Sequence, residues 1–337
     1  MTRIPRLTQL ALWMILAALV PGIASAAEIS PVPLWKLTSE AELIVVAEVS
    51  AIEELPRTER SSNSASAQLS ILETLKGPEL VTVEVPYAAR VICPQPPRYA
   101  EGETVVAFLA QHRGAWRTVG ISHGALYPQG SELDDIKVMI EAALPLQQQQ
   151  KQNQTQPQPE VLEGQRRDWL VRAATLPGTR WHGLYGLAPG NDPIRALHEW
   201  PARSIPAGLS EEQWEVLADG FVETPRMDPT FAMMAWMLKD HEDPEVDEVA
   251  LGVVEGLLAL EELPWWTQDV LWATLARFGD DGPQARLDKL GWYSWEVTPD
   301  QLRGLWAEAK KELGVPEVEP ETIELETSLL VGGQWPG

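Results

Sequence analysis

One stretch of the sequence matches the G-x-S-x-G pattern of a serine nucleophile: residues 120–124, GISHG. In hydrolases with this pattern the serine lies on a sharp turn between a strand and a helix, which exposes its hydroxyl. Here Ala125-Leu126-Tyr127-Pro128 follows Gly124, and a helix is predicted to begin only near Ser131. Gly120 and Gly124 therefore indicate a bend or bulge at the end of a strand. An extracytoplasmic serine hydrolase at Ser122 is kept as an alternative.

Carboxylates supply the other chemistry to consider. The run from His241 to Glu248 is rich in acids, but it lacks the two-histidine spacing of a zinc helix and the glycine of a calcium loop. Acids at the start of a helix are explained by the helix dipole. A carboxylate-based glycosidase that uses Asp269 or Glu296 beside tryptophan is a second enzymatic alternative. The sequence predicts no catalytic residue, no cofactor and no metal ligand.

Tryptophan is concentrated in the C-terminal half, where 12 of the 15 lie at or beyond position 169. Trp214 and Trp236 recur with helical spacing among other apolar residues, which is typical of core side chains. Four others are adjacent or nearly adjacent, so they cannot all face one core. We expect these four to form a contact surface: Trp265, Trp266, Trp292 and Trp295.

The elements that must position these residues fall on either side of residues 147–160, QQQQKQNQTQPQPE. Eight of these 14 residues are glutamine, and none is aliphatic or aromatic. Such a segment has nothing to bury that would offset the entropy of ordering it. It predicts a linker between a β-rich module at 27–146 and an α-helical module at 161–314. An acidic, extended tail is expected at 315–337.

Alternating apolar residues predict five short strands in the first module. These strands are Leu43–Val49, Ala67–Ile71, Val81–Val85, Glu103–Ala110 and Trp116–Ile121. Short helices are expected at 33–42 and 131–144, and the proline-rich segment 91–98 must be a loop. This order predicts a small OB-like β-barrel, closed or half-closed, with a flanking helix.

A family resemblance rests on three motifs of this module. They are Ala41–Val49 (AELIVVAEV), Leu75-Lys76-Gly77, and Gly102-Glu103 followed by Val105–Leu109. Their order resembles bacterial secreted proteins with a netrin-like or TIMP-like domain, over roughly residues 33–128. The resemblance implies an OB-type barrel. Animal TIMPs inhibit through an N-terminal cysteine that chelates the protease zinc, but the expected mature start here is Ala27-Glu28. Inhibition by that route is therefore not expected.

The second module carries strong helix-start signals. Capping boxes are predicted at Ser210 and Thr298, each with glutamine three residues later. Asp228-Pro229 and Asp243-Pro244 each pair an N-cap aspartate with proline at the first helical position. Residues 243–251 resemble the start of a HEAT-type helix, but no strict repeat of about forty residues is visible. Antiparallel helix pairs are expected, stacked as an irregular solenoid or packed as a compact bundle.

The N-terminus predicts export. Arg3 and Arg6 precede the apolar run Leu10–Val20, and Ala24-Ser25-Ala26 fits a cleavage site. Residues 1–26 are therefore expected to be a signal peptide, which leaves a periplasmic or extracellular protein without a membrane span; an uncleaved anchor is the alternative. Cys93 is the only cysteine, so it either pairs with another chain or stays a thiol.

The net charge of the protein limits the classes of partner that it can bind. The net charge is −23. Residues 27–146 contain 16 acidic and 9 basic side chains, and residues 161–337 contain 32 and 14. Such a surface disfavours nucleic acid and anionic membranes. We therefore predict an exported, non-catalytic binding or scaffolding protein, whose helical module contacts a protein partner of basic or polar character.

Overall fold

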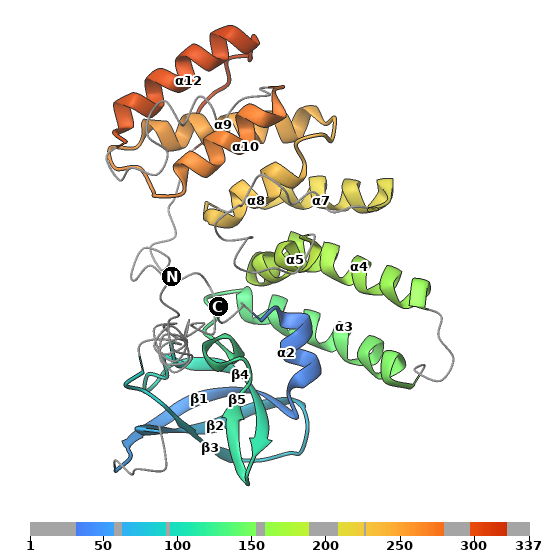
Figure 1. Ribbon diagram of the computed structural model, residues 1–337, viewed down its shortest axis with the longest axis vertical. Helices are drawn as coiled ribbons and strands as arrows, with labels where there is room; N and C mark the ends of the chain where they lie inside the picture. The colour runs from blue at the N-terminus through green and yellow to red at the C-terminus, as the bar shows by residue number, and fades with distance from the viewer. Residues whose placement is uncertain are drawn as a thin grey trace, which may run out of the picture. The chain divides into compact units, whose positions relative to one another are not determined.

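The computed structural model of the protein describes residues 32–56, 63–91, 95–152, 159–188, 208–225, 227–279 and 297–321 (Figure 1). An antiparallel sheet comes first and helices follow. Its strands are β1 (Leu43–Glu54), β2 (Ala65–Lys76), β3 (Thr82–Tyr87), β4 (Thr104–His112), β5 (Ala115–Thr118) and β6 (Ala125–Leu126). The five predicted strands are confirmed, whereas β6 is too short for any periodicity to reveal. The expected signal peptide and Cys93 lie outside the described residues.

The sheet is open, with β3 and β5 at its two ends. The strand order is β3-β2-β1-β4-β5, and β6 pairs with β4. β3 and β5 approach each other, and no ladder joins them in the described part of the chain. Tyr99 bridges the two strands instead. Its ring packs edge to face on Tyr87 of β3 at a centroid distance of 5.2 Å, and its hydroxyl lies 2.9 Å from that of Thr118 on β5.

β1 and β4 are buried on both faces. One face of β1 carries Leu43, Val45 and Ala47, which pack in an apolar cluster formed mainly by the strands. The opposite face carries Ile44 and Val46, which pack in a second apolar cluster on the outer face of the sheet. Side chains along β4 are divided in the same way, because successive residues of a strand face opposite sides. This double burial explains why β1 reads in the sequence as an uninterrupted apolar run.

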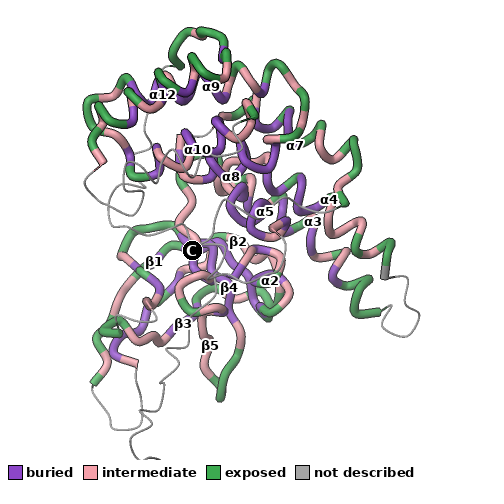
Figure 2. The backbone as a smooth tube through the Cα atoms, turned by 45° about the horizontal axis from the view of Figure 1, so that its top comes forward, coloured by how far each residue is buried: buried purple, intermediate pink, exposed green. Residues whose placement is uncertain are grey.

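Helices α2 (Leu34–Glu40) and α3 (Glu132–Gln152) contribute to the cluster on the outer face (Figures 1 and 2). α3 is longer than predicted, because the first part of the glutamine-rich run continues it. Gln147 is only 5% exposed, and its Nε2 donates to the carbonyl of Trp35 over 2.7 Å. The expectation that this run buries nothing is therefore wrong at Gln147, whereas residues 148–152 are helical and exposed. Glutamine is a good helix former, and its amide is satisfied here. Residues 153–158 lie outside the described ranges.

Seven further helices are described. They are α4 (Pro159–Thr175), α5 (Arg180–Leu187), α7 (Glu211–Glu223), α8 (Pro229–Met237), α9 (Pro244–Ala259), α10 (Thr267–Arg277) and α12 (Pro299–Leu313). The predicted capping boxes at Ser210 and Thr298 both form. The side chains of Asp228 and Asp243 each accept a backbone N–H at the first turn of α8 and α9. These starts were predictable because a cap depends only on residues within one turn.

One apolar cluster runs from the outer face of the sheet into these helices. Trp169 of α4 lies at the junction and is 4% exposed. Its Nε1 donates to the carbonyl of Met139 on α3 over 2.9 Å, and its ring packs on Trp35 at 5.1 Å. The boundary expected between modules at 27–146 and 161–314 is thus crossed by a shared core.

The segment after α12 follows the helices. Gly314 adopts the left-handed conformation that ends α12. Glu321 donates its backbone N–H to the carbonyl of Gly252 on α9 over 2.9 Å. The first part of the expected tail, 315–321, therefore lies against α9. Residues 322–337 are outside the described residues.

Candidate functional site

The predicted tryptophan surface is described only in part. Trp265 is 55% exposed, whereas Trp266 is 3% exposed and belongs to the apolar core. Adjacent side chains thus lie in different environments, as the sequence argument requires. Trp292 and Trp295 lie outside the described residues. Of the two members of the predicted surface that the structure describes, only Trp265 is exposed.

The GISHG stretch forms a turn of a different kind from a nucleophile elbow. Gly120 and Ile121 have φ angles of 62° and 60°, and Ile121–Gly124 is a single 3-10 turn that leads into β6. A Cβ added to Gly120 would lie 2.9 Å from Cγ2 of Val32, so the glycine permits close packing. Burial lowers the pKa of the adjacent His123. The strand-turn-helix context that exposes a nucleophilic serine is absent from this stretch.

Acidic residues of the run 241–248 cap a helix and pair with a buried arginine. Asp243 accepts the N–H of Glu245 over 2.8 Å and caps α9. Asp247 pairs with Arg277, whose side chain is 3% exposed. Among the described residues no group of three or more potential metal ligands comes together. Each of these two carboxylates thus has a structural partner.

Asp269 has an unusual environment for a carboxyl group. It lies in the first turn of α10, is half-buried, and burial raises its pKa to about 7. One turn later Trp272 stacks on Trp236 at a centroid distance of 4.0 Å. Trp236 is buried and Trp214 is half-buried. Glu296, the other carboxylate considered from the sequence, is outside the described residues.

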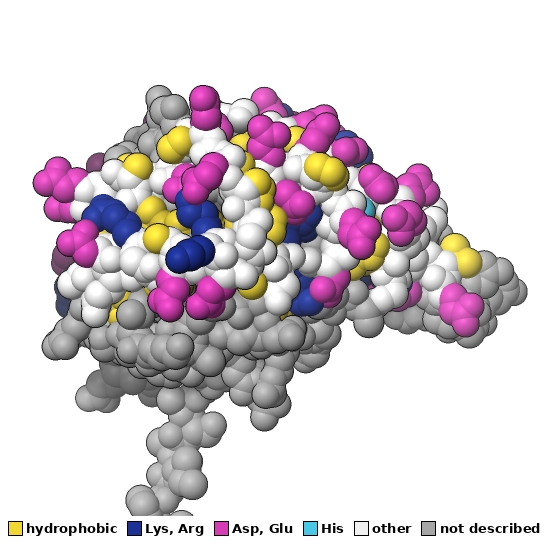
Figure 3. All heavy atoms as spheres, turned by 90° about the horizontal axis from the view of Figure 1, so that it is seen from above, with side chains coloured by type: hydrophobic (Ala, Val, Ile, Leu, Met, Phe, Trp, Pro, Cys, Tyr) yellow, Lys and Arg dark blue, Asp and Glu magenta, His cyan; other side chains and the backbone are white. Residues whose placement is uncertain are grey.

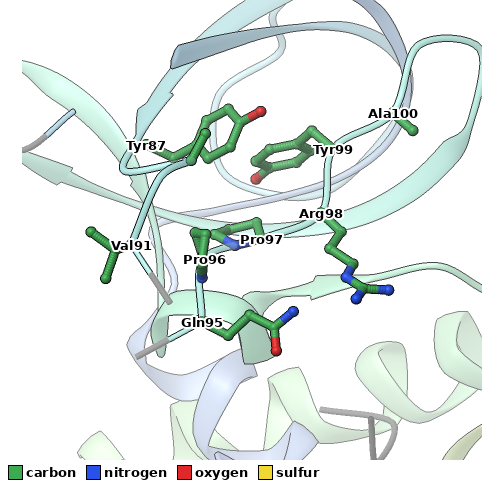
Figure 4. Close-up of a pocket in the computed structure, with 9 residues that line it drawn as sticks. Tyr87, Val91, Gln95, Pro96, Pro97, Arg98, Tyr99 and Ala100 are labelled. Atoms are coloured by element: carbon green, nitrogen blue, oxygen red, sulfur yellow. The ribbon is translucent and has the colours of Figure 1, made fainter. Parts of the chain in front are cut away.

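A cavity of about 500 Å³ opens between the end of β3 and the proline-rich segment that leads to β4 (Figure 4). Tyr87 and Tyr99 face each other on one side of Pro96 and Pro97. The side chain of Arg98 lies on the other side of these prolines together with that of Gln95 (Figure 4). The volume is in the range of small-molecule sites. This cavity is therefore a concave candidate for binding within the described chain.

The protonation states and charges of the lining residues limit what this cavity can bind. Burial raises the pKa of Tyr87 and of Tyr99, so both phenols are neutral at pH 7. The Tyr99 hydroxyl is already paired with Thr118. Arg98 is exposed, and it is the one charged residue among the nine that line the cavity. The lining supplies aromatic and proline rings, an amide and a guanidinium, all of which can contact a ligand.

The proline-rich pattern of this segment predicts a loop, because proline cannot continue a central strand. The same pattern gives no reason to select Tyr87 and Tyr99. The signal that was present is a pair of tyrosines flanking a proline-rich stretch. Their meeting depends on the approach of β3 and β5, which no local pattern encodes.

Compared with protein-family models, curated proteins and solved structures, the chain gives no match. Within the described ranges every helix is too short or too polar to span a lipid bilayer.

Proposed function

We propose that this is an exported, non-catalytic binding or scaffolding protein of the periplasm or the extracellular space. Its sheet is proposed to be an OB-type barrel of the netrin-like or TIMP-like kind, followed by HEAT-like helices. The strand order supports this assignment, since β1 pairs with both β2 and β4 while β3 approaches β5. That arrangement fits a partly open five-stranded barrel.

The cavity at Tyr87 carries the proposal of binding. It is large enough for a small ligand, and its lining combines rings with few polar groups, as binding sites do. No serine, histidine, cysteine or carboxylate is among its nine lining residues. A pocket of this composition can hold and orient a molecule.

A protein partner is proposed for the helical part, and two surface features support it. Trp265 is 55% exposed at the start of α10, and exposed tryptophan is enriched at binding hot spots. Acidic side chains are spread over the face that carries α9 and α12, among fewer basic ones (Figure 3). A partner of basic or polar character follows, with weaker binding at high salt.

A pull-down from the cell envelope of the native host tests this proposal. The bait is the full chain, compared with Trp265→Ser and with Val161→Ser. The two side chains are matched, since each is 55% exposed. We expect Trp265→Ser to lose a captured protein that wild type and Val161→Ser retain, and raised salt to release it. Equal capture by all three baits would contradict a contact at Trp265.

A hydrolase is the second candidate, and one observation favours it. A carboxyl group whose pKa is raised to about 7 is suited to general acid catalysis, and Asp269 is such a group. The test is turnover of glycan and ester libraries by wild type, Asp269→Asn and Ser122→Ala. Binding without chemistry predicts no turnover by any of them. Turnover that is abolished by Asp269→Asn, or labelling of Ser122 by a fluorophosphonate probe, would establish an enzyme instead.

A further inference from the structure

We propose that the contact between α2 and α5 is a pH-sensitive switch, which releases α2 when the imidazole of His182 takes up a proton. This device goes beyond the binding function proposed above and does not depend on it. Three features of the contact carry the proposal: a buried hydrogen bond that only an unprotonated imidazole nitrogen can accept, a second buried histidine close by, and a short helix that is held by side chains of distant elements.

The hydrogen bond joins His182 of α5 to Leu34, the first residue of α2. The backbone N–H of Leu34 donates to Nδ1 of His182 over 3.2 Å, and both residues are buried. An N–H in the first turn of a helix has no partner within that helix, and Pro33 at the N-cap supplies no side-chain acceptor. Protonation of Nδ1 turns the acceptor into a donor, so two donors would then face each other in a buried contact.

The second histidine is His123, in the 3-10 turn that follows Gly120. Its Nδ1 is buried and has no hydrogen-bond partner among the described residues, and burial lowers its pKa. Burial lowers the pKa of His182 to about 3, and a charge on His123 would lower it further. A Cβ on Gly120 would lie 2.9 Å from Cγ2 of Val32, so residues 32–34 contact both elements that carry a histidine. Each imidazole regains an ordinary pKa only when this contact opens.

No carboxylate of the described elements around α5 holds a proton on His182. α8 and the 3-10 turn at 177–179 pack against α5 and carry no charged side chain. Lys36 and Glu40 of α2 are exposed and pair with each other over 3.8 Å. Arg180 of α5 donates to carbonyls of α4 and α7. The other titratable side chains of these elements lie in an aromatic stack or are exposed or half-buried: Tyr185 of α5, and Glu160, Glu163, Arg166, Arg167, Asp168 and Arg172 of α4.

α2 can be released by itself because it depends on other elements for its stability. It has seven residues, too few for a helix that is stable alone in water. Gln147 of α3 and Lys76 of β2 donate to carbonyls of α2, each over 2.7 Å, and both keep their donors in acid. The bond to His182 is therefore the one of these three contacts that acid breaks. Leu34 and Leu37 are fully buried, so release of α2 would expose apolar surface.

Hydrogen exchange of the full chain at pH 7.5 and pH 5.0 tests the switch. After correction for the intrinsic effect of pH on exchange, the amides of α2 should open about 30-fold more often at pH 5.0, because only the open state binds the proton. His182→Gln keeps an acceptor for the N–H of Leu34 but cannot titrate, so it should reduce this factor by about 10-fold or more. His112→Gln, at an exposed position at the end of β4, should leave the factor unchanged.

Low concentrations of denaturant distinguish release of α2 from unfolding of the whole chain. Local release exposes little surface, so exchange in α2 should depend weakly on denaturant and be faster than exchange in β1, which is buried on both faces. The same free energy of opening for α2 and β1 at both pH values would overturn the switch. An equal pH factor in wild type and His182→Gln would overturn it as well. The comparison of α2 with β1 uses wild type alone, so it decides the question even where the variant does not fold.

Discussion

The interior of the sheet and the stack of helices satisfy their buried backbone carbonyls in different ways. In the sheet, neighbouring strands pair their carbonyls and N–H groups, and the cluster between the strands is made of apolar and tyrosine side chains. In the helices, each C-terminus leaves carbonyls without an intrahelical partner. Arginine side chains donate to several carbonyls at or near helix ends in the described chain. At these helix ends a long cationic side chain supplies donors of the kind that strand pairing supplies in the sheet.

Three arginines donate hydrogen bonds to carbonyls at helix ends in this way. Arg180 of α5 is 1% exposed and donates to carbonyls at the ends of α4 and α7. Arg277 at the end of α10 donates to the carbonyl of Leu238 after α8 and to that of Asp243 before α9. Arg303 of α12 donates to the carbonyls of Leu258 and Leu260 at the end of α9. Each arginine links its own helix to the ends of others.

The largest effect should come from the junction at which the two regions share a core. Trp169→Ala removes the ring that packs on Trp35 and the donor that satisfies the carbonyl of Met139. We expect a loss of about 4 kcal/mol in the free energy of unfolding. Trp265→Ala, at an exposed position, should cost less than about 0.5 kcal/mol. Denaturation followed by both far-UV circular dichroism and tyrosine fluorescence measures it. A separate transition for the sheet, unchanged by Trp169→Ala, would show that the regions do not unfold together.

The second largest loss of stability is expected when an arginine that donates to helix-end carbonyls is replaced. Arg180→Lys keeps the charge but cannot reach the carbonyls of Ala174, Thr175 and Gly220 at once, because an ammonium is a single point. We expect about 3 kcal/mol of destabilisation, because the carbonyls of Ala174 and Thr175 lose the guanidinium and that of Gly220 keeps only the hydroxyl of Thr224. Arg172→Lys, on the exposed side of α4, is the matched control and should be nearly neutral. Equal melting temperatures for the two variants would remove the distinction drawn between sheet and helices.

Sequence reasoning succeeded where structure is local and failed where it is not. The helix starts at Ser210, Asp243 and Thr298 follow from residues within one turn, and each is found as predicted. The burial of Gln147 was missed because its partner, Trp35, is 112 positions away. The bridge from Tyr99 to Thr118 likewise requires β3 and β5 to meet. Composition describes these residues correctly as polar or loop-forming, but only tertiary packing gives them partners.

The third effect concerns how closely helices approach each other. A Cβ added to Gly183 of α5 would lie 2.2 Å from the backbone nitrogen of Ala174 on α4. Since backbone cannot yield as a side chain does, we expect Gly183→Ala to cost about 2–3 kcal/mol. Gly164 is the matched helical glycine, because a Cβ there would meet nothing within 4 Å. Gly164→Ala should stabilise by about 0.5–1 kcal/mol, since alanine favours helix. Thermal unfolding of both variants decides the matter, and the same sign for both would contradict close packing of α4 on α5.

The smallest expected effect is a change in the pH dependence of stability, caused by His182 at the contact between α5 and α2. His182 of α5 accepts the N–H of Leu34 at Nδ1 over 3.2 Å, which requires that nitrogen to be unprotonated. Burial, aided by the neighbouring His123, lowers the pKa of His182 from 6.5 to about 3. Between pH 6.5 and about 3, His182 therefore binds a proton in the unfolded chain but stays neutral in the folded chain. Stability is full above pH 6.5 and falls as the pH drops toward 3, by at most about 1.4 kcal/mol per pH unit.

His182→Gln separates this titration from the rest of the protein. The glutamine oxygen can accept the same N–H, so the contact with Leu34 persists while the proton-binding group is removed. Between pH 6.5 and 5.5 the variant should lose about 1 kcal/mol less than wild type in denaturant titrations. His112→Gln, an exposed control, should keep the wild-type slope. If His182→Gln also keeps that slope, the imidazole is not held neutral at the junction. The shared core would then admit water where α2 meets α5, and the sheet and helices would be less tightly joined than their contacts indicate.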